Sequence, residues 1–155
     1  MTNLMGNFSS KDWLKIFFSC FTVLGTPFFY IPVSFYFVQI HNSLLIKLIT
    51  IFVAVEIIGA GIKLVYYKKR PVATGHKNLY EKYLAASFPS IHSARIMAIA
   101  IAAGSLYFTP LFIFISVLFV LGVGYSRIYL KKHDVIDVVS GFLFGAIITV
   151  IIWII

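Results

Sequence analysis

Acidic residues are scarce in this sequence. Its 155 residues include only 5 Asp and Glu against 13 Lys and Arg, and charged residues of both signs make up 12% of the chain, whereas hydrophobic residues make up 61%. Soluble domains normally carry about a quarter of their residues as charged side chains. The composition therefore excludes an ordinary water-soluble globular protein and indicates an integral membrane protein.

Cysteine is also nearly absent, since Cys20 is the only one. A single cysteine excludes an intramolecular disulfide, an iron–sulfur cluster and a cysteine-based zinc site. The net charge of +8 does not indicate a nucleic-acid partner, because the basic residues crowd the ends of apolar segments instead of forming a basic face. Anionic membrane lipids or a phosphate group are the expected counterparts of these cations.

Long apolar runs fill most of the chain, and its mean hydropathy is +0.98. Because a helix needs about 20 apolar residues to cross a bilayer core, each long run is a candidate span. Before them, SSKDWLKIFFSCF predicts an interfacial helix with Ser10 as its N-cap and Asp12 in its first turn. A sixth, kinked span is the alternative for this segment. We expect an all-α transmembrane bundle of about five spans, at residues 26–41, 45–66, 91–107, 110–130 and 135–155.

The organisation of the chain is simple. The N-terminus lacks the pattern of a removable signal peptide, and no repeat or linker divides the sequence, so we expect one transmembrane domain over residues 1–155. Gly122 and Gly124 in one predicted span, and Gly141-x-x-x-Gly145 in another, predict close helix packing. The polar stretch 67–87 is too long for a turn and can form a lid or a collar over a substrate.

Polar and charged residues gather at segment ends that share one side of the membrane. If successive spans alternate in direction, the end of 45–66, the start of 91–107, the end of 110–130 and the start of 135–155 lie on the same face. The opposite connections are almost uncharged. Because ionisable groups at membrane depth are costly and usually functional, we expect these four ends to form one site.

The first polar group is Lys63-x6-Arg70-Pro71. Its two cations are two helical turns apart, which predicts one shared helix face, and Pro71 disfavours helix at Arg70, so that the guanidinium can turn inward. A planar fork and a point charge together suit a tetrahedral dianion. The alternative is a snorkelling pair that anchors the helix end in the interface.

The second polar group is the stretch FPSIHSAR, residues 88–95. Pro89 and Ser90 predict a helix start, whose free N–H groups and positive dipole end bind anions. His92 and Arg95 are three residues apart and project from the same helix face. The stretch can hold a phosphate with its backbone while it presents a proton donor. An ordinary capped helix with an interfacial histidine is the alternative.

The third polar group is Ser126-Arg127-x5-His133-x3-Asp137. If the last helix starts near His133, this residue and Asp137 form an i, i+4 pair in which the carboxylate accepts a proton from one ring nitrogen. The other nitrogen then keeps a free lone pair and can attack as a nucleophile. A satisfied histidine–aspartate pair at a helix start is the alternative.

In this order, the three groups resemble the three-part signature of the type 2 phosphatidic acid phosphatase family, whose superfamily also contains the vanadium haloperoxidases. The resemblance covers residues 63–137 and implies a metal-independent lipid phosphatase, without a cofactor, that works through a phosphohistidine intermediate. By position, it implies His133 as the nucleophile, Asp137 as its orienting partner and His92 as the acid that protonates the leaving oxygen. It also implies a phosphate site made by Lys63, Arg70, Ser90, the backbone N–H of Ile91, and Arg127.

The chain departs from the family pattern at Ile91, where the family usually has glycine. A side chain at this position keeps the backbone N–H but restricts close backbone approach and positive φ. The departure predicts a differently shaped phosphate pocket in which every side-chain group of the signature is intact.

Among lipid phosphates, a polyprenyl pyrophosphate or phosphate is the favoured substrate, because Arg95 lies one turn past His92 and can contact a second phosphate. Phosphatidylglycerol phosphate, phosphatidic acid and saccharide-lipid phosphates are alternatives, as are phosphoryl transfer to an acceptor other than water and a non-catalytic lipid-phosphate carrier. Glu56, in the middle of a span, is expected to pair with Lys63 or with a backbone group. The remaining surplus cations are expected to anchor the protein in the interface: Lys68, Lys69, Lys131 and Lys132.

Two arguments disagree about the side of the membrane on which the site lies. The excess of Lys and Arg on the site-bearing face places this face in the cytoplasm by the positive-inside rule. The resemblance implies the outer or lumenal side, where many such lipid phosphatases act. We expect the extracytoplasmic side, because basic residues around a phosphate site have a reason of their own.

Overall fold

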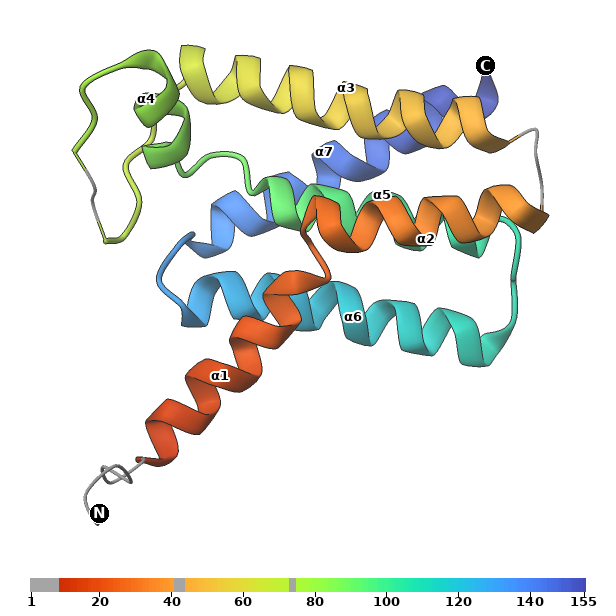
Figure 1. Cartoon of the computed structure of the whole chain (residues 1–155), viewed down its shortest axis with the longest axis horizontal. Coiled ribbons are helices and arrows are strands. Elements are labelled where there is room, and N and C mark those ends of the chain that lie inside the picture. Colours follow the sequence, from red (N-terminus) through yellow and green to blue (C-terminus); the bar gives the residue numbers. More distant parts are fainter. Residues whose placement is uncertain (1–8, 41–43, 73–74) are drawn as a thin grey trace, which may run out of the picture.

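The structure is a computed structural model that describes residues 9–40, 44–72 and 75–155. These residues form helices and no strand, as predicted, and Figure 1 shows the helices side by side along the long axis of the molecule. The helices in chain order are α1 (Ser10–Val23), α2 (Pro27–Ile40), α3 (Leu44–Val65), α4 (Leu79–Ala85), α5 (Ile91–Gly104), α6 (Pro110–Tyr129) and α7 (Val135–Ile154).

Three of these helices, α3, α6 and α7, are long and apolar enough to cross a membrane. Helices α1 and α2 pass the same test only together, across a bend of 44°, which gives up to four candidate spans among the described residues. Helix α5 has 14 residues, about 21 Å of helix against a bilayer core of about 30 Å. The chain is a transmembrane helix bundle, and all five predicted spans are helical, but α2 and α5 are shorter than a full span.

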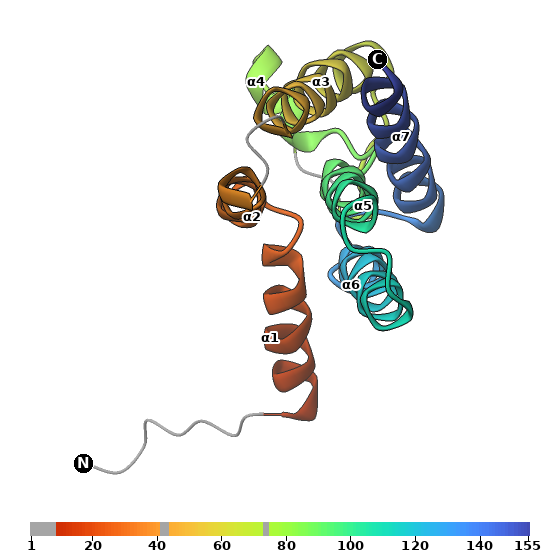
Figure 2. The same cartoon turned by 90° about the vertical axis from the view of Figure 1, so that its right-hand side faces the viewer.

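Helix α1 leads away from the other helices in both Figure 1 and Figure 2. Its N-cap is Ser9, not the predicted Ser10, because Asp12 lies three residues after Ser9 and completes a capping box with it. Phe18 packs against the rings of Tyr125 and Tyr129 on α6. No side chain of α1 is buried. Other large apolar side chains of α1 are exposed, among them Leu14, Ile16 and Phe17, and its place in the membrane interface stays a prediction.

Helix α5 lies at the centre of the bundle, against α7, α6, α3 and α2 (Figure 2). A Cβ atom on Gly141 would lie 2.4 Å from the carbonyl oxygen of Ser90, and one on Gly145 would lie 2.2 Å from that of Ala94. The backbones of α5 and α7 therefore touch, and the close packing predicted from Gly141-x-x-x-Gly145 is confirmed.

Two further glycines hold α6 against its neighbours. A Cβ atom on Gly122 would lie 2.4 Å from the ring of Phe21 on α1, and one on Gly124 would lie 2.6 Å from the ring of Phe142 on α7. Both were predicted as packing residues, and both are. Together with α5, they fix the ends of α6 and α7 relative to one another.

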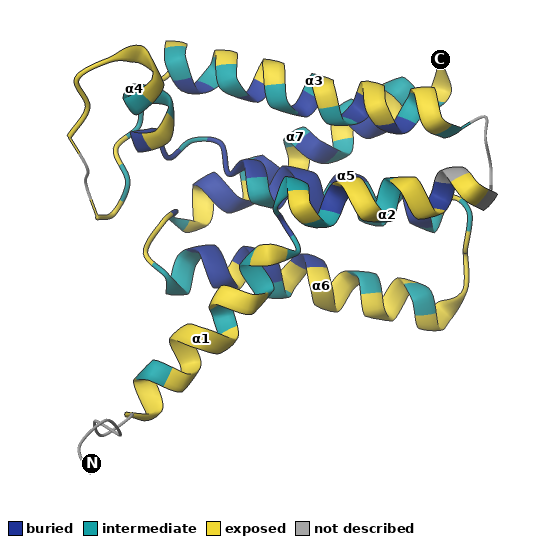
Figure 3. Cartoon of the chain, viewed as in Figure 1, coloured by how far each residue is buried: buried dark blue, intermediate teal, exposed yellow. Residues whose placement is uncertain are grey.

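Buried residues follow α5 and gather at the end of the molecule that carries α4 (Figure 3). At this end α3 and α6 finish while α5 and α7 begin (Figure 1). Burial of a polar group is costly unless the group is paired, so a buried polar cluster indicates a site. The buried polar residues here are Lys63, Ser87, Ser90, Ser93, Arg95, Ser126, Arg127, His133 and Asp137.

Candidate active site

A cavity of about 120 Å³ lies at this polar end of the bundle. All four segment ends that the sequence places on one membrane face contribute to its wall. Helix α4, which belongs to the predicted collar 67–87, adds two more residues. Residues 73–74 of that collar lie outside the described part of the chain. The structure thus brings six of the predicted site residues and Arg95 to one cavity. The wall consists of Lys63, Arg70, Tyr83, Leu84, Ile91, His92, Arg95, Arg127 and His133.

Three cations give the cavity a strongly positive wall. Lys63 is only 4% exposed and donates a hydrogen bond of 2.7 Å to the carbonyl oxygen of Ala86. The Nε atoms of Arg70 and Arg127 are buried and have no hydrogen-bond partner among the described residues. Because a buried guanidinium N–H without an acceptor is costly, these donors indicate that the cavity accepts an anion.

Lys63 and Arg70 do not share a helix face, contrary to the prediction. Helix α3 ends at Val65, five residues before Arg70, and the chain that follows is not helical. The two cations nevertheless line the same cavity, because the backbone turns back there: the N–H of Ser87 donates to the carbonyl oxygen of Lys68 at 2.7 Å. A loop, and not helical periodicity, brings Arg70 to the site.

The start of α5 supplies a backbone anion site. Ser90 is the N-cap, is fully buried, and makes no capping hydrogen bond with its side chain. Its hydroxyl accepts a hydrogen bond of 2.9 Å from Ser93, and its N–H donates to the carbonyl oxygen of Asp137 at 3.0 Å. The first N–H groups of a helix have no partner within the helix, so those that begin at Ile91 are available to an anion.

Ile91 fits where the family usually has glycine because a glycine stands opposite it. A Cβ atom on Gly59 of α3 would lie 2.4 Å from Cδ1 of Ile91, so the isoleucine side chain fills the notch that Gly59 leaves. Among the described residues other than glycine, only Lys131 has positive φ. The predicted restriction of positive φ therefore does not arise, and the side chain packs against Ile51 and Val55.

His133 and Asp137 lie close together but are not directly hydrogen-bonded. Their Nδ1 and Oδ2 atoms are 3.7 Å apart. The predicted i, i+4 geometry fails because α7 starts at Val135 with Asp134 as its N-cap, which leaves His133 outside the helix.

The hydroxyl of Ser87 bridges the two residues. It lies 3.3 Å from Nδ1 of His133 and donates a short hydrogen bond to Oδ2 of Asp137. With a proton on Nδ1, the imidazole donates to Ser87 and Ser87 donates to the carboxylate, so each group is used once. Sequence reasoning missed Ser87, and its only signal was its position two residues before Pro89.

The carboxylate of Asp137 is held from its other side by Lys68. Nζ of Lys68 lies 2.8 Å from Oδ1 of Asp137 and 2.5 Å from Oδ2 of Asp134. Partial burial opposes the charged amine, but the two carboxylates outweigh it and raise the pKa of Lys68. The prediction that Lys68 only anchors the protein in the interface is wrong, because the loop after α3 brings its amine between the carboxylates of Asp134 and Asp137.

His133 is held in its neutral form. It is 3% exposed, and burial, helped by the charges of Arg127, Lys63 and Arg70, lowers its pKa to about 4, although Asp137 acts in the opposite direction. When Nδ1 carries the proton, Nε2 keeps its lone pair at neutral pH. This imidazole is therefore available as a nucleophile.

Arg95 pairs with Glu56 across the bundle. Its Nε lies 2.6 Å from Oε1 of Glu56 and its Nη2 lies 2.9 Å from Oε2, while Nη1 donates to the carbonyl oxygen of Gly25 at 3.0 Å. The predicted partners of Glu56, Lys63 or a backbone group, are wrong. Arg95 lines the cavity, but it is not the free cation that a second phosphate was expected to meet.

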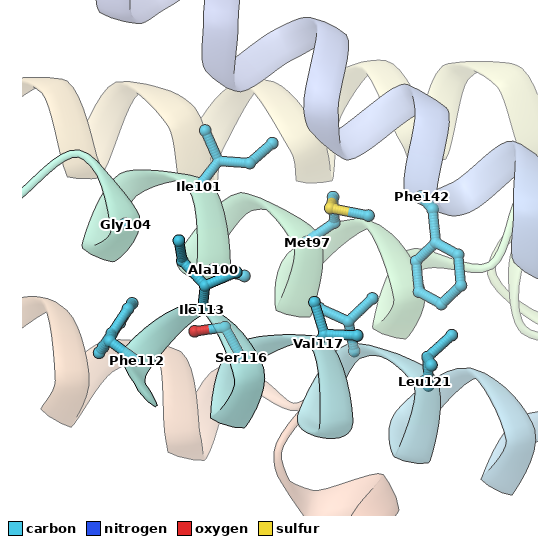
Figure 4. A pocket seen from close by; sticks show the side chains of 11 residues that line it. Met97, Ala100, Ile101, Gly104, Phe112, Ile113, Ser116, Val117, Leu121 and Phe142 are labelled. Carbon is cyan, nitrogen blue, oxygen red and sulfur yellow. The ribbon is translucent and has the colours of Figure 1, made fainter. Parts of the chain in front are cut away.

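A second, larger cavity is apolar. It measures about 370 Å³ and lies between α5, α6 and Phe142 of α7, and Figure 4 shows its lining of aliphatic and aromatic side chains with the single hydroxyl of Ser116. No titratable side chain lines it. Among the described residues, no three His, Cys, Asp or Glu side chains gather where they could hold a metal ion. The chemistry of the described chain is therefore concentrated in the smaller cavity.

Comparison with known proteins agrees with this geometry. The family model of the PAP2 superfamily matches residues 44–155. The crystal structure of LpxE from Aquifex aeolicus superposes with a TM-score of 0.78 at 23% identity, over 92% of this chain and 87% of that one. The crystal structure of a transmembrane PAP2-type phosphatidylglycerolphosphate phosphatase from Bacillus subtilis gives 0.72 at 23% identity, over 91% and 75%. Curated protein sequences give no match. The chain belongs to the PAP2 superfamily and is an integral membrane hydrolase of lipid phosphates.

Proposed function

We propose that the protein removes a terminal phosphoryl group from a lipid phosphate through a phosphohistidine at His133. One observation carries this proposal: His92 and His133, from different segments, line a single cavity together with Lys63, Arg70 and Arg127. An anion in this cavity is surrounded by the two imidazoles and the three cations. A nucleophile, an acid and charge stabilisation are what phosphoryl transfer requires.

In the first step, Nε2 of His133 attacks phosphorus and the bond from phosphorus to the lipid oxygen breaks. His92 gives its proton to this leaving oxygen, so that the lipid departs as an alcohol. Nδ1 of His133 holds its proton against Ser87, and Asp137 stabilises the positive charge that the ring acquires. The enzyme is left with a phosphoryl group on His133 and a neutral His92.

In the second step, a water molecule attacks the phosphoryl group and the bond from phosphorus to nitrogen breaks. His92 takes a proton from this water, which restores the acid for the next cycle. The cations Lys63, Arg70 and Arg127, the hydroxyl of Ser90 and the N–H of Ile91 stabilise the equatorial oxygens in both steps. Inorganic phosphate then leaves.

The pairing of Arg95 favours a single phosphoryl group. The cavity has a volume of about 120 Å³ and Arg95 lies in its wall. Because Arg95 is engaged by Glu56, no free cation at that position waits for a second phosphate. We therefore propose a lipid monophosphate, such as phosphatidylglycerol phosphate, phosphatidic acid or a prenyl phosphate, ahead of the polyprenyl pyrophosphate favoured from the sequence.

A phosphate-release panel tests this function. Purified protein in EDTA is given prenyl phosphate, prenyl pyrophosphate, phosphatidylglycerol phosphate, phosphatidic acid and a saccharide-lipid phosphate, beside the His133→Ala variant. We expect release from at least one monophosphate and none from the variant. Loss of lipid phosphate without free phosphate, in the presence of an added alcohol, would show phosphotransfer. Binding without release from any of these lipids would show a carrier and contradict the proposal.

We propose that residues 1–155 form one domain whose five apolar helices all lie within the membrane, with the active site on the extracytoplasmic side. Cysteine labelling tests the orientation. Cys20 is exposed, so the background variant is Cys20→Ser, and Lys77→Cys places a single thiol on the polar connection before α4. Labelling of intact cells by a membrane-impermeant reagent supports the extracytoplasmic side. Labelling only after permeabilisation places the site in the cytoplasm.

A further inference from the structure

The guanidinium of Arg95 joins three segments that are far apart in the sequence. It forms a two-pronged ion pair with Glu56 of α3 and donates to the carbonyl oxygen of Gly25, which lies in the break between α1 and α2. Arg95 itself stands on α5, one turn after His92. All three nitrogens of the guanidinium thus donate to protein groups, and two of them form the planar fork with Glu56.

The break between α1 and α2 is packed directly on His92. A Cβ atom on Gly25 would lie 2.8 Å from Cβ of His92 and 3.0 Å from its carbonyl oxygen. Among the described residues, none donates a hydrogen bond to the His92 ring or accepts one from it. The backbone at Gly25 therefore packs closely against Cβ and the backbone of His92.

The ion pair also sets the charge of this wall. Arg95 is 7% exposed and Lys63, Arg70 and Arg127 line the same cavity. Without Glu56, Arg95 would be a buried cation without a counter-charge, close to three other cations. Such an uncompensated buried charge strongly destabilises the folded state. A guanidinium released from Glu56 would be drawn to the phosphate and would lose its bond to Gly25.

We propose that the Glu56–Arg95 ion pair is a positioning device for the acid of the reaction: it clamps the Gly25 break against His92 and so aims the His92 imidazole at the leaving oxygen. This inference rests on the proposed role of His92. Neither residue touches the reacting atoms, so both are positioning residues and not catalytic ones. The sequence alone indicated Arg95 as a contact for a second phosphate and Glu56 as a partner of Lys63 or of a backbone group.

The proposal makes a prediction that depends on the leaving group. Protonation by an acid matters for an alkoxide, which is a poor leaving group, and hardly matters for a nitrophenolate, which leaves without a proton. Two substrates with the same alkyl chain separate the cases: an alkyl phosphate, and a nitrophenyl phosphate that carries the chain on its ring. Misplacement of His92 slows formation of the phosphohistidine from the first substrate and spares it from the second. The attack of water, in which His92 acts as the base, is common to both substrates, so the comparison uses kcat/KM, which reports the steps up to departure of the leaving group.

The test compares the two substrates across a set of variants. Glu56→Gln keeps the shape of the side chain and removes its charge, Arg95→Lys keeps the charge and removes the fork, and the double variant Glu56→Gln with Arg95→Gln removes both charges, which guards against misfolding by an unpaired cation. Glu81→Gln, the same change at an exposed carboxylate of α4, is the matched control. His92→Ala gives the full effect of a missing acid.

We expect Glu56→Gln and Arg95→Lys to lower kcat/KM for the alkyl phosphate about 10- to 100-fold, part of the 100- to 10,000-fold that an acid contributes. For the nitrophenyl phosphate, kcat/KM should change less than threefold, and the double variant should behave in the same way. Glu81→Gln should match the wild type with both substrates. An equal loss with both substrates would overturn the proposal, since it indicates a structural role.

Two other results are distinguishable. If Arg95 variants slow a prenyl pyrophosphate far more than the matching monophosphate, Arg95 is a ligand for a second phosphate and the positioning proposal is wrong. If His92→Ala itself slows both substrates equally, the role of His92 in the proposed function is wrong, and the inference falls with it.

Discussion

The hydroxyl of Ser87 bridges the carboxylate of Asp137 and Nδ1 of His133, which lie 3.7 Å apart without a direct hydrogen bond. The serine comes from the segment between α4 and α5, whereas Asp137 lies in the first turn of α7 and His133 precedes this helix. The orientation of the nucleophile therefore depends on a segment that is distant from it in the sequence.

Ser87→Ala should lower kcat by about 10- to 100-fold, because loss of a group that orients a reacting imidazole from the outside typically has this effect. The alanine leaves Nδ1 too far from Asp137 to select the reactive tautomer. Ser87→Thr keeps the hydroxyl and should retain most of the activity. Steady-state kinetics on one lipid phosphate measure both. Full activity of Ser87→Ala would show that His133 is oriented without the serine.

Lys68→Gln should lower kcat about tenfold, because Asp137 loses the cation that holds its Oδ1. Lys68→Arg keeps the charge and should stay within about threefold of the wild type on the same basis. Lys69 stands next to Lys68 and forms no ion pair with any described residue, so Lys69→Gln is the matched control and should be neutral. Equal effects of Lys68→Gln and Lys69→Gln would reduce the role of Lys68 to general attraction of an anionic substrate.

His133 should make the protein less stable as the pH falls below neutrality. Burial lowers its pKa to about 4 in the folded protein, whereas an unfolded histidine has a pKa of about 6.5. Between these values the unfolded chain binds a proton that the folded chain does not. The free energy of unfolding therefore decreases as the pH is lowered, by up to about 1.4 kcal/mol per pH unit. Thermal midpoints in detergent, measured from pH 7 to pH 4 for the wild type and for His133→Asn, should converge as the pH falls. Parallel curves would contradict a depressed pKa.

Gly145→Ala should destabilise the bundle, because its new Cβ would lie 2.2 Å from the carbonyl oxygen of Ala94. Overpacking of this kind typically costs about 1–3 kcal/mol, and it would also push α5 away from α7 and so spread the site. Gly61→Ala on α3, where a Cβ meets nothing within 4 Å, is the control. Its thermal midpoint should be unchanged or higher. A Gly145→Ala variant as stable and active as Gly61→Ala would show that α5 and α7 tolerate separation.

The sequence predicted the bundle and its polar end well, because both depend on patterns that are local. Apolar runs show where helices lie, small residues such as Gly141 and Gly145 show where backbones touch, and the alternation of spans brings the four polar ends together. His92 and His133 could be placed in one site for this reason alone. The match of the PAP2 superfamily model to residues 44–155 confirms the family resemblance.

What the sequence could not predict is how the polar side chains choose their partners. From the sequence, Arg95 was expected to contact a second phosphate and Lys68 to anchor the protein in the interface, yet Lys68 holds Asp137 and Arg95 holds Glu56. The choice depends on where the chain turns after α3 and on where α1 breaks, and neither is periodic. Ser87 was missed for the same reason, since only the folded loop places its hydroxyl beside His133.

The most direct test of the account is to look for the phosphoryl group on the enzyme. Purified protein in EDTA is mixed with a lipid phosphate labelled in the phosphoryl group, quenched with base within one turnover, and digested for peptide mapping. The account predicts a base-stable, acid-labile label on the peptide that contains His133, and no label in His133→Ala. Release of labelled phosphate at the normal rate by His133→Ala, or a label on His92 instead, would contradict it.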